Sequence, residues 1–242
     1  RIIYSRLWSD GSLQYRLVRN NPNSCGNVDQ ESLKLCHPVN FQGEFIKHGH
    51  CDVSQLAERL SNLPATVWEA DAFRQRKFEV HQDTQTIKLL MDEDFRHTHP
   101  SVQPQFHQFL DLLEPILVQL RNLFDSSETA KELVANNYRP GYFIRIILVN
   151  LKSKGSIARH FDDYESLKRS HRIHLPIITN PKVLITVGDT TKHIKLGEIW
   201  EINNREHHWV NNESNQDRVH MILDYVLPGE TVIDRDGATL TC

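Results

Sequence analysis

The apolar positions divide the chain into two parts with different periods. In the first part they recur at helical spacing, as in Leu56, Leu60 and Leu63, and Asp52 can cap that helix. After Gly141, short runs rich in Ile, Val and aromatic residues alternate with turn sequences, as is typical of β-strands. The pattern therefore predicts helices followed by a β-rich half.

Two further helices are predicted before the β-rich half. One begins near Pro104 and has an apolar stripe that reaches Phe124, although Pro115 should kink or break it. The next begins at a cap, Ser126 or Ser127, and ends near residue 134. We expect these helices to pack on the outside of a sheet.

The β-rich half contains short strand-like runs separated by turn sequences such as Lys154-Gly155 and Leu196-Gly197. Strands of this length and spacing favour a mainly β protein with flanking helices, built around a jelly-roll or cupin-like barrel. The mouth of such a barrel suits a small-molecule site. The runs span residues 142–149, 156–160, 171–178, 182–187, 192–196, 198–202, 207–211 and 218–226.

These elements predict one main domain with an N-terminal addition. Residues 1–50 define no clear period and are interpreted as an N-terminal extension of uncertain structure, in which Leu13 to Val18 could form an edge strand. Residues 51–242 are expected to form the domain itself. Its helical support covers about residues 52–136, and its β core covers about residues 138–228.

Composition narrows the class of protein. The 242 residues are 39% hydrophobic, enough for one substantial core, and the net charge of -3 disfavours nucleic acid as a partner. No run approaches the apolar length of a membrane helix, and the four cysteines are too widely spaced for a metal clip. We expect a cytoplasmic location and a small-molecule or peptide partner, although the chain begins at Arg1 and a targeting segment could precede it.

The chemistry is predicted by a pair of residues in the segment RHFDDY. His160 and Asp162 are two apart, so a strand directs both side chains to the same face. His207 and His208 follow at a distance that suits a strand returning to the same site, and alternation alone does not decide which of them points inward. Two imidazoles and a carboxylate leave coordination positions open, which is the arrangement of non-haem Fe(II) oxygenases.

An arginine completes the predicted site. Arg218 lies ten residues beyond His208 in a strand-like run, and its fixed fork could pair with a dicarboxylate such as 2-oxoglutarate. Arg172 and His174 share a face of another run and could add polar contacts to the co-substrate. By itself, a histidine on an apolar strand is more often a hydrogen-bonded core residue than a ligand.

At these residues the chain resembles the aspartyl/asparaginyl β-hydroxylase family of Fe(II)- and 2-oxoglutarate-dependent oxygenases. The resemblance covers about residues 138–226, through RHFDDY, RIHLPI, LGEIWEINN, HHWVNN and DRVHMILD. It implies a double-stranded β-helix that uses Fe(II), 2-oxoglutarate and O₂ to hydroxylate an unactivated C–H bond. Succinate and CO₂ are the expected by-products.

The resemblance also implies roles for individual residues. It selects His208 as the distal metal ligand beside His160 and Asp162. Arg218, Arg172 and His174 are implied as co-substrate contacts, and Asn150 stands where family members place a polar co-substrate contact. Because Asp162 is present, the site is similar to that of the bacterial-type branch and not to the animal enzyme that lacks this carboxylate.

The substrate and two alternative functions stay open at this point. The resemblance favours an amino acid or peptidyl side chain over an acyl chain. A cupin-type metalloenzyme that does not use 2-oxoglutarate would have the same three metal ligands, and the direction of Arg218 would distinguish it. A non-catalytic metal- or ligand-binding barrel is the other alternative.

Overall fold

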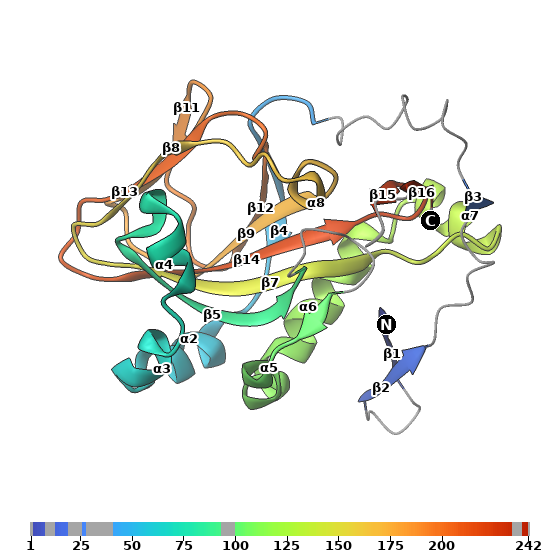
Figure 1. Ribbon diagram of the computed structural model, residues 1–242, viewed down its shortest axis with the longest axis horizontal. Helices are drawn as coiled ribbons and strands as arrows, with labels where there is room; N and C mark the ends of the chain where they lie inside the picture. The colour runs from blue at the N-terminus through green and yellow to red at the C-terminus, as the bar shows by residue number, and fades with distance from the viewer. Residues whose placement is uncertain are drawn as a thin grey trace.

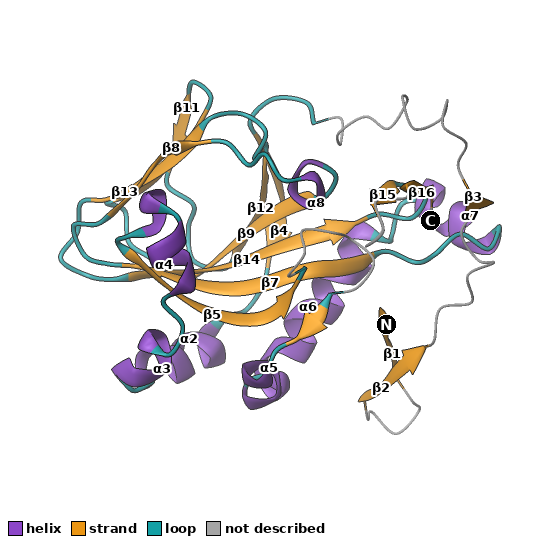
Figure 2. Cartoon of the chain, viewed as in Figure 1, coloured by secondary structure: helices purple, strands orange, loops and turns teal. Residues whose placement is uncertain are grey.

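The computed structural model describes residues 2–7, 13–18, 26–27, 41–92, 100–233 and 239–241. Two antiparallel sheets face one another in its centre, and helices cover the outer face of the larger sheet (Figures 1 and 2). This arrangement is the double-stranded β-helix that the sequence predicts, and the mainly β class with flanking helices is confirmed.

The larger sheet contains seven strands of the described residues, in the order β4-β12-β9-β14-β7-β5-β6. Neighbouring strands are antiparallel, and β14 lies between β9 and β7. Side chains alternate along β14, so that Val219, Met221 and Leu223 face the helices while Arg218 and His220 face the second sheet. The strands are β4 (Phe45–His50), β5 (Thr84–Met91), β6 (Ser101–Val102), β7 (Tyr142–Leu151), β9 (His171–Ile178), β12 (Glu198–Ile202) and β14 (Arg218–Val226).

The smaller sheet has the order β11-β10-β13-β8 within the described part of the chain. Its apolar side chains meet those of the larger sheet, since Ile157 and Val210 belong to the same buried cluster as Leu151 and Ile202. This cluster fills one end of the space between the sheets. The strands are β8 (Ser156–His160), β10 (Val183–Val187), β11 (Thr190–Lys192) and β13 (His208–Asn212).

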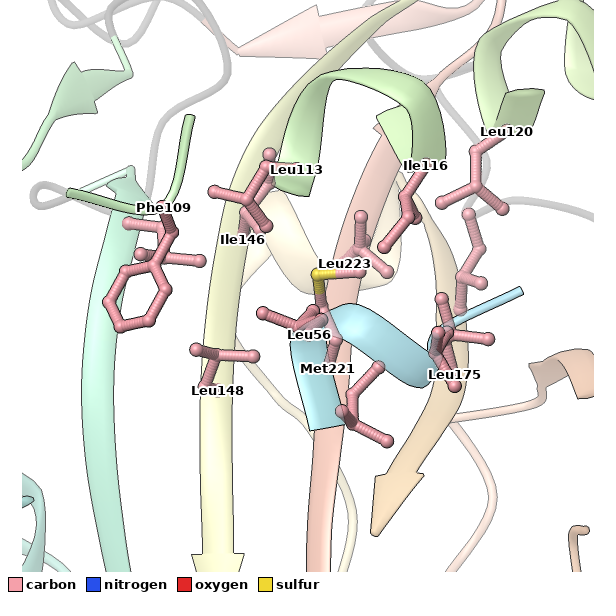
Figure 3. Packing of buried hydrophobic residues seen from close by; sticks show 14 of the residues in the cluster. Leu56, Phe109, Leu113, Ile116, Leu120, Ile146, Leu148, Leu175, Met221 and Leu223 are labelled. Atoms are coloured by element: carbon pink, nitrogen blue, oxygen red, sulfur yellow. The ribbon is translucent and has the colours of Figure 1, made fainter. Parts of the chain in front are cut away.

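The helices that cover the outer face of the larger sheet include α2 (Ser54–Ser61), α5 (Pro104–Gln108) and α6 (Leu110–Phe124). Figure 3 shows how Leu113 and Ile116 of α6 lie over strand residues that include Ile146. Burial of this apolar stripe stabilises both layers, at about 25 cal/mol for each Å² removed from water. The main core of the protein therefore lies outside the space where the predicted site residues gather.

The remaining described elements are short or lie at the ends of the chain. Helix α7 (Glu128–Ala135) begins at Ser127, whose hydroxyl accepts a bond from the backbone N–H of Ala130. Strands β1 and β2 form a hairpin, and β15, β16 and β3 form a small sheet. Their bounds are β1 (Ile2–Leu7), β2 (Leu13–Val18), β3 (Gly26–Asn27), α3 (Ala65–Glu69), α4 (Phe73–Lys77), η1 (Glu79–His81), α8 (Glu165–Lys168), β15 (Thr231–Ile233) and β16 (Thr239–Thr241).

Two elements differ from the sequence prediction in position. The long helix is interrupted at Phe109 and not at Pro115, which lies inside α6. The buried stripe on either side of Pro115 holds the helix against the sheet, and this packing outweighs the loss of one backbone hydrogen bond. The strand expected at 192–196 is instead β11, which covers residues 190–192. It begins at Thr190 because Gly188 and Asp189 form the two-residue turn between β10 and β11.

Strands β5 and β4 are among the strands that the sequence did not predict. Strand β5 lies within the segment expected to be helical support, and it pairs with β7 along most of its length. Strand β4 lies within residues 1–50 and extends the same sheet beyond β12. Both are held by neighbouring strands that are distant in sequence, so local patterns gave little sign of them. No helix among the described residues is long and apolar enough to cross a membrane.

Candidate metal and co-substrate site

The three predicted metal ligands lie together between the two sheets. His160 and His208 face one another across the β8–β13 pair, and their ring centroids are 4.3 Å apart. Asp162 follows β8, and one ligand atom from each of the three residues lies within 4.8 Å of the others. His207 is not part of this group, because its ring packs against Phe161 at 5.3 Å.

The backbone orients both histidines for metal binding. The Nδ1 atom of His160 lies 2.7 Å from the carbonyl oxygen of Ala158, and that of His208 lies 3.0 Å from the carbonyl oxygen of Glu206. A carbonyl oxygen only accepts, so each Nδ1 must carry the hydrogen. In the neutral ring Nε2 then keeps its lone pair free for a metal ion.

The electrostatics of the site also suit a divalent cation. Burial lowers the pKa of His208 to about 4, so this ring is neutral at pH 7. Burial would raise the pKa of Asp162, but the positive charge of Arg172 and the neighbouring histidines outweighs it and lowers that pKa below its usual range. The cluster therefore offers two imidazoles and one carboxylate, the donor set that Fe(II) accepts in non-haem oxygenases.

Arg218 is fully buried deeper between the sheets. Its 0% exposed side chain shares a face of β14 with His220, and its strand partner in the register is Leu151 of the barrel interior. Nη2 lies 2.8 Å from Nδ1 of His220, whereas Nε and Nη1 have no hydrogen-bond partner within the described residues. Arg218 thus points into the barrel.

His174 lies between the three-residue cluster and Arg218. Its Nδ1 atom is 3.4 Å from Nδ1 of His220. Burial, followed by the charges of Arg218 and Arg172, holds the pKa of His174 well below its usual range. Burial and Arg218 have the same effect on the pKa of His220. Both rings are therefore neutral at pH 7 and leave the charge of Arg218 uncompensated.

The structure does not bring Asn150 to this site. In the β7–β14 register, Asn150 is opposite Val219, whereas Leu151 is opposite Arg218, so Asn150 is on the helix-covered face. Its Nδ2 atom donates to Oε1 of Gln85 and to Oδ2 of Asp217 at 3.2 and 3.0 Å. The alternation of β7 is the physical reason, and we leave Asn150 out of the site proposed below.

Arg172 reaches the site, and its charge is already paired there. It donates to Oδ2 of Asp162 through Nη1 and to both carboxylate oxygens of Asp224. Three of its five N–H groups are used in this way, and two remain for another acceptor. A contact with the co-substrate therefore stays a prediction for this residue.

A cavity of about 690 Å³ opens onto the outer side of the cluster. Helix α4 and the turn η1 form one wall, and the segment that contains His160 and Asp162 forms another. The lining combines aromatic and aliphatic side chains with a few charged ones. It consists of Phe73, Lys77, Phe78, Val80, His81, Lys88, Met91, Asp92, Arg145, His160, Phe161, Asp162, Asp163 and Tyr164.

Sequence reasoning missed several buried polar residues around the cluster. Asn204 donates to Oδ2 of Asp162 at 3.1 Å, and Asp224 holds Arg172. Arg145 and Asp92 form a buried ion pair at the base of the cavity. Of these residues, only Asp224 could have been predicted from the sequence, because it follows Arg218 at an even spacing in the same strand and therefore shares its face.

The fold and the cluster together define a double-stranded β-helix protein with a two-histidine, one-carboxylate centre and a buried arginine. Residues 128–228 match the family model described as aspartyl/asparaginyl β-hydroxylase, and this segment contains the whole cluster and Arg218. That part of the chain is similar in sequence to this family of Fe(II)- and 2-oxoglutarate-dependent oxygenases. No curated protein matches the chain in sequence.

Solved structures of similar shape have low sequence identity to this chain. The viral collagen prolyl hydroxylase of Paramecium Bursaria Chlorella virus-1 is 10% identical, with a TM-score of 0.47 over 76% of this chain and 95% of that one. A 2OG-Fe(II) oxygenase family protein from Burkholderia pseudomallei is 12% identical, with a TM-score of 0.43 over 73% and 90% of the two chains. Because both TM-scores are below 0.5, we draw nothing about activity from them.

Proposed function

We propose that this protein is a 2-oxoglutarate-dependent dioxygenase that hydroxylates an unactivated C–H bond of an amino acid or peptidyl side chain. His160, Asp162 and His208 would hold Fe(II), and Arg218 would anchor the distal carboxylate of 2-oxoglutarate. When bound, the iron with the co-substrate and O₂ supplies the oxidising power for hydroxylation, and succinate and CO₂ are released.

The observation that supports the co-substrate most directly is the unpaired charge of Arg218. No carboxylate among the described residues forms an ion pair with it, and burial lowers its pKa to about 9. A buried, unpaired guanidinium is costly, and a bound carboxylate would restore the missing charge and accept from Nε and Nη1. A cupin-type enzyme without 2-oxoglutarate would have no use for this group.

The residues of the chain have separate tasks in this proposal. Nε2 of each ligand histidine is left free by the Nδ1 bond to the backbone, so the rings cannot turn away. Arg218 and neutral His174 would orient the co-substrate from the inner side. The cavity between α4 and the cluster would admit the substrate from the outer side, and its aromatic walls would exclude water from the reacting bond.

The test is succinate formation from 2-oxoglutarate by Fe(II)-loaded protein under air, with and without pooled amino acids and peptides. His208→Ala removes a proposed ligand, and His207→Ala is the matched control because that ring lies outside the cluster. We expect succinate formation that depends on His208 but not on His207 and that rises with the correct substrate. Metal binding without any succinate, even uncoupled, would favour the cupin-type or the non-catalytic alternative.

A further inference from the structure

The two carboxylate oxygens of Asp162 have different surroundings. Oδ1 lies 4.0 Å from Nε2 of His160, on the side of the histidine cluster. Oδ2 accepts from Nη1 of Arg172 and, at 3.1 Å, from Nδ2 of Asn204. Because Oδ2 is occupied by two donors, Asp162 is presented to a cation through one oxygen only.

Arg172 is in turn held by Asp224, its direct partner in the β9–β14 register. Nε donates to Oδ1 of Asp224 and Nη2 donates to Oδ2, both at 2.8 Å. This bidentate pair fixes the plane of the guanidinium. With two of its three nitrogens held in this way, the third can only be directed at Asp162.

Asp224 is itself fixed from its other side. Nε of Arg145 lies 3.6 Å from Oδ2 of Asp224 and donates to Oδ1 of Asp92 at 2.8 Å. Asp92 also accepts from the hydroxyl of Ser166. The array formed in this way consists of Asp162, Arg172, Asp224, Arg145 and Asp92, whose charges alternate. The last four are buried, and the array leads from the metal ligand Asp162 to the base of the substrate cavity.

We propose that Asp224 is a positioning residue of the metal centre, which acts through Arg172 to fix Asp162 as a ligand with a single free oxygen. The inference rests on the proposed function, because it concerns the metal site assigned there. Asp224 touches neither the ligand atoms nor the cavity, so its effect must pass through the guanidinium. A purely structural role would affect folding alone.

The test is the affinity of the purified protein for Mn(II), followed by the EPR signal of the free ion and without 2-oxoglutarate. Asp224→Asn keeps the shape of the side chain but ends its bidentate acceptance from Arg172. We expect Mn(II) binding to weaken by roughly 10- to 100-fold, the usual effect of losing a residue that supports a metal ligand. Asp217→Asn is the matched control, because Asp217 directly precedes β14, the strand that contains Asp224, and its side chain is 41% exposed.

A second control separates positioning from general destabilisation. Gly197→Ala should destabilise the fold without changing any residue of the array, and it should bind Mn(II) as the unaltered protein does. Circular dichroism and thermal melting check that each variant is folded. Where Asp224→Asn does not fold, Asp224→Asn combined with Arg172→Gln removes the ion pair as a unit and leaves no unpaired charge in that pair.

The outcomes distinguish this inference from the proposed function. Unchanged Mn(II) affinity in folded Asp224→Asn, or in the double variant where the single one does not fold, would overturn the role of Asp224 while leaving the metal site intact. Weakened binding in Asp224→Asn with normal binding in both controls supports it. Absence of saturable, His208-dependent Mn(II) binding in the unaltered protein would overturn the metal site itself.

Discussion

Nη2 of Arg218 lies 2.8 Å from Nδ1 of His220, two residues further along the same strand. His220 is neutral because burial, and then the charge of Arg218, holds its pKa well below the usual range. The imidazole can therefore accept a hydrogen bond but cannot compensate the charge. The pair orients the guanidinium without neutralising it, and an anion remains its natural partner.

Removing this guanidinium should raise the requirement for 2-oxoglutarate. We expect Arg218→Ala to raise the KM for the co-substrate by about 30-fold or more, because a lost buried charge pair costs at least 2 kcal/mol. Initial rates of succinate formation against 2-oxoglutarate concentration measure it. Arg159→Ala is the control, since Arg159 is exposed and near the Trp209 ring. An unchanged KM in Arg218→Ala would remove the residue from its proposed role.

Each of the three proposed metal ligands should be needed for turnover and not for folding. His160→Ala and Asp162→Ala should abolish succinate formation and lower metal affinity, because each removes one of only three protein donors. The melting temperature of His160→Ala should change little, because the His160 side chain is outside both buried hydrophobic clusters. An active variant that binds no metal would contradict the assignment.

A second buried charge cluster lies on the opposite face of β9. His171 contacts Oε1 of Glu201 through Nδ1 at 2.6 Å and Oε1 of Glu230 through Nε2 at 2.8 Å. Glu201 also contacts Nε2 of His48, and the charge of Arg205 lies close by. Burial lowers the pKa of His171, but the two carboxylates outweigh it and raise that pKa to about 10.

This cluster predicts a loss of stability at alkaline pH. The folded-state pKa of His171 lies above the unfolded value of about 6.5, so its contribution is complete below that pH and disappears as pH rises through 10. At pH 6.5, His171→Gln should lower the free energy of unfolding by about 3 kcal/mol, the cost of breaking a buried ion pair. The difference from the unaltered protein should shrink by pH 10.

Urea denaturation at a series of pH values measures this effect. His107→Gln is the matched control, because that histidine is exposed on α5 and should leave the pH profile unchanged. A constant difference between His171→Gln and the unaltered protein from pH 6.5 to 10 would show that His171 is not protonated in the folded state.

Gly197 should stabilise the turn before β12 more than any residue with a side chain would. Its φ of +71° is unfavourable for other residues, and a Cβ atom would lie 2.4 Å from the carbonyl oxygen of Cys51. We expect Gly197→Ala to cost about 2 kcal/mol or more in the free energy of unfolding. Gly43→Ala has a similar φ of +80° but meets nothing within 4 Å, so the difference between the two variants isolates the backbone clash.

Local patterns were sufficient for much of the fold because short apolar runs between turns have few alternatives. Most strands after Gly141 and the helices α2, α6 and α7 follow from the spacing of apolar residues, and α7 also follows from its cap at Ser127. Strand β5 could not be predicted in this way, since its stability comes from pairing with β7. The break at Phe109 likewise reflects how two helices fit the sheet and not a local signal.

The sequence by itself determined which residues could do the chemistry. Period-two alternation places His160 with Asp162, and Arg172 with His174, because side chains two apart share one face of a strand. Alternation does not say which face is inside, nor which strands are neighbours. The tertiary structure placed His208 in the cluster, which alternation had left undecided between His207 and His208. Only the tertiary structure put Asn150 on the other face and joined Asp162 to Asp224 through Arg172, because pairing between distant strands sets their register.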